Sequence, residues 1–179
     1  ISEQEFIRAV WRYLDRTASG LSPATGALDW MERLTPWLAR SSELSKSVWT
    51  LEDGSELGFL ANGNGDERSL AARYVERFAG QTVERLVIVS PYWDHDLAAL
   101  RWLIATLNPL QTVVILQEQH GQFPAHAAHD LGLLIVRPPP EVGPRFLHAK
   151  LIIATANGSD HVLIGSANCT TAALGYAER

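Results

Sequence analysis

Apolar residues recur at two different periods along the chain, and the period predicts which kind of element forms. Helical spacing in the first part predicts amphipathic helices over residues 3–16 and 27–38. Gly20 and Pro23 are expected to end the first helix, and Pro36 is expected to kink or end the second. The chain therefore begins with a helical segment.

From residue 48 the pattern changes to short apolar runs separated by turn residues. Near-continuous apolar runs are typical of strands buried within a sheet. The expected elements are strands 48–51 and 57–60, a helix 66–78 capped by Asp66, strand 85–90, helix 96–107, strand 112–116, a short helix 125–131, and strands 133–136, 147–154 and 161–164. This alternation predicts an α/β fold with a mixed β-sheet flanked by helices.

A polar stretch between residues 41 and 47 has neither period and predicts a module boundary. We expect an N-terminal helical extension over residues 1–45 and an α/β domain over residues 46–179. The chain has 179 residues, of which 46% are hydrophobic and 20% charged, as in an ordinary globular domain. Because it begins at Ile1 and stops just after a predicted helix start, we expect a fragment of a longer protein.

Charge and cysteine content narrow the class of protein. The net charge of -5 disfavours a strongly cationic nucleic-acid surface and leaves room for a local basic patch. The single cysteine, Cys169, cannot form an internal disulfide, so we expect a buried, inert thiol and a cytoplasmic location. No apolar run is long enough to span a membrane, and the N-terminus does not read as a signal peptide, so no membrane partner is expected.

Two neighbouring predicted strands carry polar groups that suit a phosphate diester. His148 and Lys150 are two residues apart, so on a strand their side chains share one face. Ser166 and Asn168 follow Gly165 at the end of the next strand, and a hairpin would return them beside the first pair. An ammonium, an amide and backbone N–H groups hold anionic oxygens, and an imidazole attacks phosphorus or transfers a proton. The alternatives are a solvent-exposed strand face and a plain turn.

The segment FLHAKLIIATANGSDHVLIGSANCT, residues 146–170, resembles the histidine–lysine–aspartate motif of the phospholipase D superfamily. The resemblance implies one phospholipase D-like half-domain in which His148 forms a covalent phosphohistidine. It further implies that Lys150 and Asn168 bind the phosphoryl oxygens and that Ser166 steadies the histidine or the phosphate. The implied hydrolysis needs no metal and no other cofactor.

Two departures from the family pattern bear on this expectation. Thr155 occupies the position that is usually acidic. The family's site also needs two motifs, one for the nucleophile and one for the proton donor, and this chain carries one. The second motif is expected from a homodimer, with the shared site on its two-fold axis, or from the rest of a longer chain.

The segment SPYWDHD, residues 90–96, follows a predicted buried strand, where open α/β sheets place their ligand crevices. The expected substrate-binding residues are Tyr92 or Trp93, stacking on a base, with Arg145 as a source of positive charge and Gly165 at the end of the last strand. The alternative for the two aromatic residues is packing in the core.

Two roles are also open for the aspartates and the histidine of this segment. Asp94 or His95 is expected either to face the phosphate or to belong, with Asp96, to the first turn of the following helix.

The expected function is a metal-independent phosphodiesterase, a nuclease acting on DNA through a phosphohistidine. The ending GSANCTTAALG resembles bacterial family members in DNA restriction and phage defence, which implies a helicase or defence-complex partner. The alternative from another class is a catalytically degenerate scaffold, or a module that binds the phosphate backbone within a larger complex. A lipid or small-diester hydrolase is a third reading.

Overall fold

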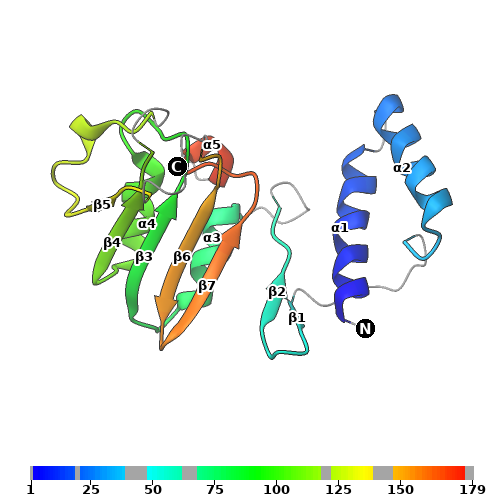
Figure 1. The fold of residues 1–179 in the computed structure, drawn as a ribbon, viewed down its shortest axis with the longest axis horizontal. Helices are drawn as coiled ribbons and strands as arrows, with labels where there is room; N and C mark the ends of the chain where they lie inside the picture. Colours follow the sequence, from blue (N-terminus) through cyan, green and yellow to red (C-terminus); the bar gives the residue numbers. More distant parts are fainter. Residues whose placement is uncertain are drawn as a thin grey trace. The chain divides into compact units, whose positions relative to one another are not determined.

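The computed structural model describes residues 2–18, 21–38, 48–61, 68–117, 122–138 and 147–175. The chain forms two compact units, residues 1–64 and residues 65–179. Figure 1 shows two helices and a two-stranded hairpin in the first unit and a five-stranded sheet with helices in the second.

The first unit joins a hairpin to the N-terminal helices. Its elements are α1 (Ser2–Ala18), α2 (Ser22–Leu34), β1 (Val48–Thr50) and β2 (Glu56–Gly58). Phe6 of α1 meets Trp49 of β1 edge-on, with ring centroids 5.4 Å apart, and Tyr13 meets Phe59 in the same way at 5.3 Å. Because the hairpin packs on α1, the units divide after residue 64 rather than near residue 45.

The ends of the two N-terminal helices differ from the expected ones. Pro23 lies in the first turn of α2, where a proline costs no hydrogen bond, so it begins the second helix instead of ending the first. α2 consequently starts and ends earlier than predicted. The buried Trp11 of α1 donates from Nε1 to Glu32 Oε1 at 2.8 Å and joins the two helices. The predicted connection 41–47 and the Asp66 cap lie outside the described residues.

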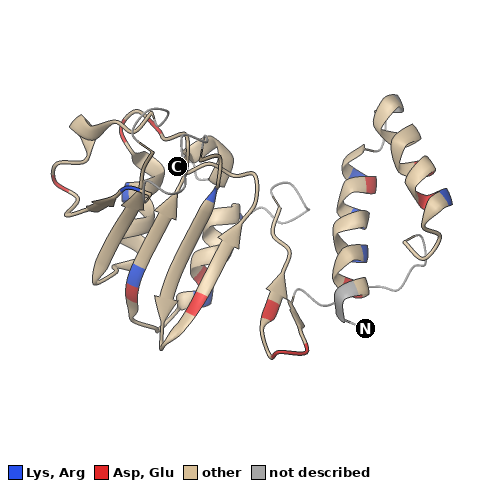
Figure 2. Cartoon of the chain, viewed as in Figure 1, with Lys and Arg blue, Asp and Glu red and all other residues tan. Residues whose placement is uncertain are grey.

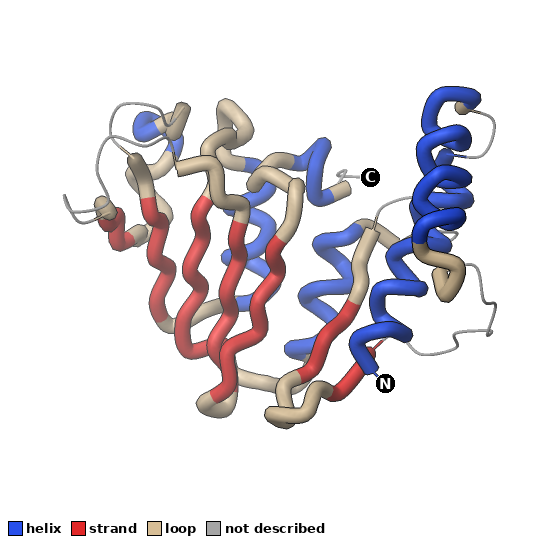
Figure 3. The backbone as a smooth tube through the Cα atoms, turned by 45° about the vertical axis from the view of Figure 1, so that its right-hand side comes forward, coloured by secondary structure: helices blue, strands red, loops and turns tan. Residues whose placement is uncertain are grey.

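The second unit is an α/β fold with a mixed sheet, as predicted. Its elements are α3 (Leu70–Val75), the 3₁₀ turn η1 (Glu76–Phe78), β3 (Val83–Val89), α4 (Ala98–Leu107), β4 (Gln111–Ile115), the 3₁₀ turn η2 (Ala125–Ala127), β5 (Leu134–Val136), β6 (Leu151–Ala156), β7 (Ser159–Ile164) and α5 (Thr171–Leu174). The strand order is β5–β4–β3–β6–β7. β3, β4 and β5 run parallel, whereas β6 is antiparallel to β3 and β7 is antiparallel to β6 (Figure 1). Figure 3 shows strands of this sheet lying side by side.

The core of this unit lies between the sheet and the helices that cover one of its faces (Figure 1). Leu86 and Ile88 of β3 and Leu100 and Leu103 of α4 are 0% exposed. The apolar stripe of α4 packs there, as expected of an amphipathic helix. The prediction that β3 is buried on both faces holds on only part of the second face, where Val89 is buried, Val87 is half-buried and Arg85 is exposed.

Two of the shorter helices in this unit differ from the helices that the local sequence pattern predicts. The predicted helix 125–131 is a single 3₁₀ turn, because so short a segment cannot repay the cost of starting an α-helix. α3 begins at Leu70, after Ser69, whose hydroxyl accepts a hydrogen bond from the N–H of Ala72 at 3.0 Å.

Among the described residues, Lys and Arg are interspersed with Asp and Glu along both units in the view of Figure 2. Within the described ranges, no helix combines the length and apolarity that a membrane crossing requires.

Candidate functional site

Three chain segments meet the sheet side by side at one edge, namely the edge formed by the end of β3, the start of β6 and the end of β7. Val89 at the end of β3 pairs with Leu151 at the start of β6, which pairs with Ile164 at the end of β7. Three segments therefore lie just beyond these paired residues. One begins at Ser90, one ends at Lys150, and one begins at Gly165. The N–H of Gly165 donates to the carbonyl of Lys150 at 3.4 Å, which ties two of the segments together.

His148 and Lys150 lie in the extended segment before β6, whereas the sequence placed them on the strand itself. Because neither residue is on a strand, the alternation of side chains along a strand does not determine the direction in which these two side chains point. Instead, the ammonium of Lys150 donates to the backbone carbonyl of His148 at 3.1 Å. The imidazole of His148 is exposed to solvent, so the structure leaves it accessible to a substrate.

Tyr92 lies beside the imidazole. Its ring is edge-on to that of His148, with centroids 6.4 Å apart and planes at 80°, and the residue is 41% exposed. Trp93 is only 8% exposed and packs edge-on against Phe123 at 5.1 Å. This burial favours the alternative of core packing for Trp93, and Arg145 lies outside the described residues.

The turn after β7 presents a row of polar groups. The backbone N–H groups of Ser166, Ala167 and Asn168 have no acceptor within the part of the chain that is described, and the side chain of Ser166 is exposed. Backbone N–H groups in a turn are able to donate hydrogen bonds to an anion. The turn therefore offers three backbone donors in addition to the serine hydroxyl.

The side chain of Asn168 has an unusual environment. Its Oδ1 is buried and has no hydrogen-bond partner among the described residues. A buried polar atom without a partner costs free energy unless a ligand or a solvent molecule completes it. The carboxamide can also rotate by 180° and present its NH₂ group at the same place. Either orientation makes Asn168 a candidate ligand-contacting residue.

Asp94 and Ser90 hold this turn from the end of β3. Asp94 caps the first turn of α4 by accepting from the N–H of Ala99 at 3.0 Å, and it also accepts from Thr171. Leu97 occupies the N-cap position of α4 and no acidic residue lies in its first turn, so the expected capping role is met only in that Asp94 and Asp96 accept from N–H groups of that turn. Ser90 is not among the residues predicted for the site, and its one signal in the sequence is a hydroxyl at the end of an apolar run. The ring centroid of His95 lies 4.9 Å from that of His126.

Cys169, directly after the turn, is 2% exposed. Burial raises the pKa of its thiol, and the nearby charge of Asp94 raises that pKa further. Because only the thiolate is a good nucleophile, Cys169 is an inert packing residue, as predicted.

Thr155, the departure from the acidic position, lies at the far end of β6. Its hydroxyl donates to Asp160 Oδ1 at 2.6 Å across the β6–β7 hairpin. Five residues of extended chain separate it from Lys150, a span of about 16 Å. The substitution therefore removes no group from the edge where His148 and Asn168 lie.

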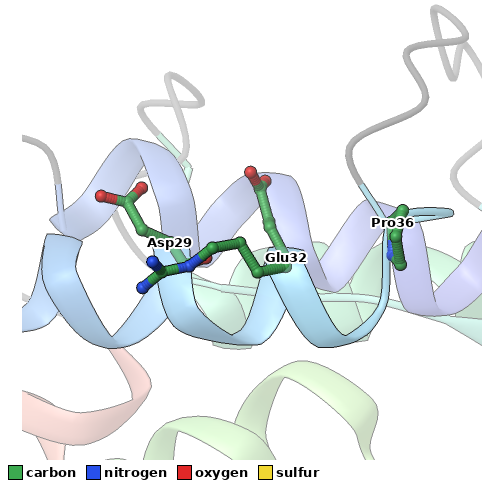
Figure 4. Close-up of a pocket in the computed structure, with 4 residues that line it drawn as sticks. Asp29, Glu32 and Pro36 are labelled. Carbon is green, nitrogen blue, oxygen red and sulfur yellow. The ribbon is translucent and has the colours of Figure 1, made fainter.

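Other candidate sites fall elsewhere or are not formed. Within the described residues, no three histidine, cysteine, aspartate or glutamate side chains are arranged to hold a metal ion. A hollow on the first unit is lined by Asp29, Glu32, Arg33 and Pro36, on α2 and just after it (Figure 4). It contains none of the residues that the sequence predicts for chemistry.

No family model, curated protein or solved structure matches this chain. The class of site consequently follows from geometry alone. It is a sheet edge at which an exposed imidazole, an ammonium, a hydroxyl, a carboxamide and three backbone N–H groups belong to adjoining segments.

Proposed function

We propose that this chain is the nucleophile-bearing half of a metal-independent phosphodiesterase of the phospholipase D type. The observation that supports it is the convergence of the segments carrying His148, Lys150 and Ser166–Asn168 at one edge of the sheet. Such a set of donors neutralises the charge that builds up on the non-bridging oxygens of a diester, while the imidazole supplies the nucleophile.

The proposed reaction has two steps. A ring nitrogen of His148 forms a bond to phosphorus while the bond to the leaving oxygen breaks, and a second histidine protonates that oxygen. Water then attacks the phosphohistidine, losing its proton to the second histidine, and the bond between nitrogen and phosphorus breaks. Lys150, Asn168 and the backbone N–H groups hold the phosphoryl oxygens throughout.

The proposed substrate is DNA, with the half-exposed Tyr92 beside the imidazole as a platform for a base. The second histidine comes from another copy of the chain or from a further segment of a longer protein. A cytoplasmic role in DNA restriction or phage defence, with a helicase or another defence protein as partner, completes the proposal. The net charge of -5 then requires that partner to supply most of the DNA-binding surface.

The test is cleavage of DNA in the presence of EDTA. Wild-type protein is expected to cleave single- or double-stranded DNA without added metal. His148→Ala is expected to reduce the rate by more than about 10³-fold, because an enzyme that loses its nucleophile loses most of its rate enhancement. Acid quenching of a reaction with ³²P-labelled substrate is expected to trap label on wild-type protein and none on the variant.

His129→Ala is the matched control, because His129 is another exposed histidine and lies outside the three segments. It is expected to retain wild-type activity, and circular dichroism checks that both variants are folded. If wild type and His148→Ala bind DNA equally and cleave nothing, the chain is a phosphate-backbone-binding scaffold and the enzyme proposal is wrong.

A further inference from the structure

The turn of residues 165–168, called the anion-suited turn below, is followed by backbone that two side chains bind. These are Ser90 and Asp94, in the segment just after β3. The hydroxyl of Ser90, a residue only 6% exposed, accepts from the N–H of Cys169 at 3.0 Å and donates to the carbonyl of Tyr92 at 2.7 Å. The carboxylate of Asp94 accepts from the N–H of Thr171 at 3.0 and 3.1 Å and from its hydroxyl at 3.1 Å.

These bonds border the unpaired donors. Cys169 and Thr171 lie just after residues 166–168, and the bond from Gly165 to the carbonyl of Lys150 lies just before them. A short β-bridge between Trp93 and Cys169 adds a further tie. The turn is consequently held at both ends, while its three middle N–H groups have no acceptor among the residues that the structure describes.

Fixed donors bind an anion better than mobile ones, because their ordering cost is met when the protein folds. Ser90 also holds the carbonyl of Tyr92, the residue beside His148. One buried hydroxyl therefore links the segment that carries the donors to the segment that carries the aromatic ring.

We propose that Ser90 and Asp94 are positioning residues that fix the N–H groups of residues 166–168 in the geometry that binds a phosphoryl group. They do so through Cys169 and Thr171, and neither is assigned a contact with the substrate. The inference rests on the proposed function, since it assumes that the turn binds phosphate.

If Ser90 and Asp94 only stabilised the fold, removing a comparable hydrogen bond elsewhere would weaken phosphate binding as much. The chain offers two matched controls for this comparison. Asp96 accepts from the N–H of Ala98 at 3.1 Å in the first turn of the same helix, but no hydrogen bond joins it to residues 165–171 within the described chain. Ser69 likewise accepts from a helix N–H at 3.0 Å, at the start of α3. Asp96→Asn and Ser69→Ala therefore remove comparable bonds without touching the turn.

The experiment titrates inorganic phosphate into ¹⁵N-labelled protein and follows the amide signals of residues 166–168. Wild type is expected to show saturable shifts at these amides. Asp94→Asn and Ser90→Ala are expected to weaken phosphate binding by about tenfold or more, the effect of losing a bond to a charged or buried partner. The two controls are expected to stay within about twofold of wild type.

Hydrogen exchange without phosphate gives an independent readout. The N–H of Thr171 is expected to exchange at least about tenfold faster in Asp94→Asn than in Asp96→Asn, and that of Cys169 faster in Ser90→Ala than in Ser69→Ala. Normal phosphate binding in both Asp94→Asn and Ser90→Ala overturns the positioning role and leaves the proposed function standing. Wild type that neither shifts with phosphate nor cleaves a diester overturns the proposed function, and the inference with it.

Discussion

Single side chains in the second unit have environments that alter their acidity. Arg101 donates to both oxygens of Asp130, at 3.0 and 2.8 Å, and this hydrogen bonding lowers the pKa of Asp130 from its ordinary value of 3.8 to about 2. Arg101 also donates to the carbonyl of Ala127 at 2.7 Å. One guanidinium thus fastens the segment around η2 to α4.

Because the pKa of Asp130 is lower in the folded protein than in the unfolded chain, the pair stabilises the fold above about pH 3.8, and this contribution is lost as the pH falls through about 2. An NMR titration of the side-chain carboxyl carbons is expected to give a midpoint for Asp130 near 2. Arg101→Gln is expected to move that midpoint toward 3.8.

Asp53 is the internal reference for this titration, since the pKa of its carboxyl is lowered by hydrogen bonds from Ser55 and not by an arginine. Its midpoint is expected to stay unchanged in Arg101→Gln. A shift of both aspartates together would show a general effect of the substitution and not the loss of one ion pair.

At the scale of elements, α3 is joined to the β6–β7 hairpin by one buried phenol. Tyr74 is 3% exposed, and its hydroxyl donates to the carbonyl of His161 in β7 at 2.8 Å. Burial raises the pKa of Tyr74 above its ordinary value, so the hydroxyl remains a donor across the physiological range. The helix thereby supports the hairpin whose other end carries the anion-suited turn.

Tyr74→Phe is expected to lower the free energy of unfolding by about 1 kcal/mol, because the carbonyl of His161 loses a buried donor while the ring packing is kept. Tyr92→Phe, which removes an exposed hydroxyl, is expected to cost less than about 0.5 kcal/mol. Urea unfolding with unchanged m-values measures both, and equal losses in the two variants would show that the bond to His161 contributes nothing.

At the scale of the whole molecule, the chain carries one set of the groups that we propose to bind phosphate and one motif histidine. The proposed reaction needs a second histidine, so an active preparation of this chain alone has to bring two copies together. The described residues include the whole five-stranded sheet and the turn, so each copy contributes an equivalent edge.

We therefore expect active protein to sediment at twice its mass of 19.7 kDa, with a specific activity that falls on dilution as the copies separate. Analytical ultracentrifugation and a cleavage assay over the same concentration range provide the comparison. Full activity in a concentration-independent monomer would mean that the second proton donor lies within this chain.

Much of the second unit is predictable from the sequence because its signals are local. Apolar runs predict the strands of the sheet. An Asn-Gly pair is typical of a two-residue hairpin turn, and Asn157 and Gly158 between β6 and β7 both adopt the positive φ that such turns need. The four residues His148, Lys150, Ser166 and Asn168 were chosen from residue type and spacing. Their chemistry requires little tertiary information beyond the pairing of two consecutive strands.

The sequence by itself determined the strands, the hairpin and the list of polar groups, because each depends on neighbours a few residues away. Only the tertiary structure decided that Trp93 packs inside while Tyr92 lies beside His148, and that Ser90 and Asp94 bind residues 169–171. Those outcomes depend on contacts between residues far apart in the sequence, 79 positions for Ser90 and Cys169 and 77 for Asp94 and Thr171, which local patterns do not encode and which form only when the sheet brings distant segments together.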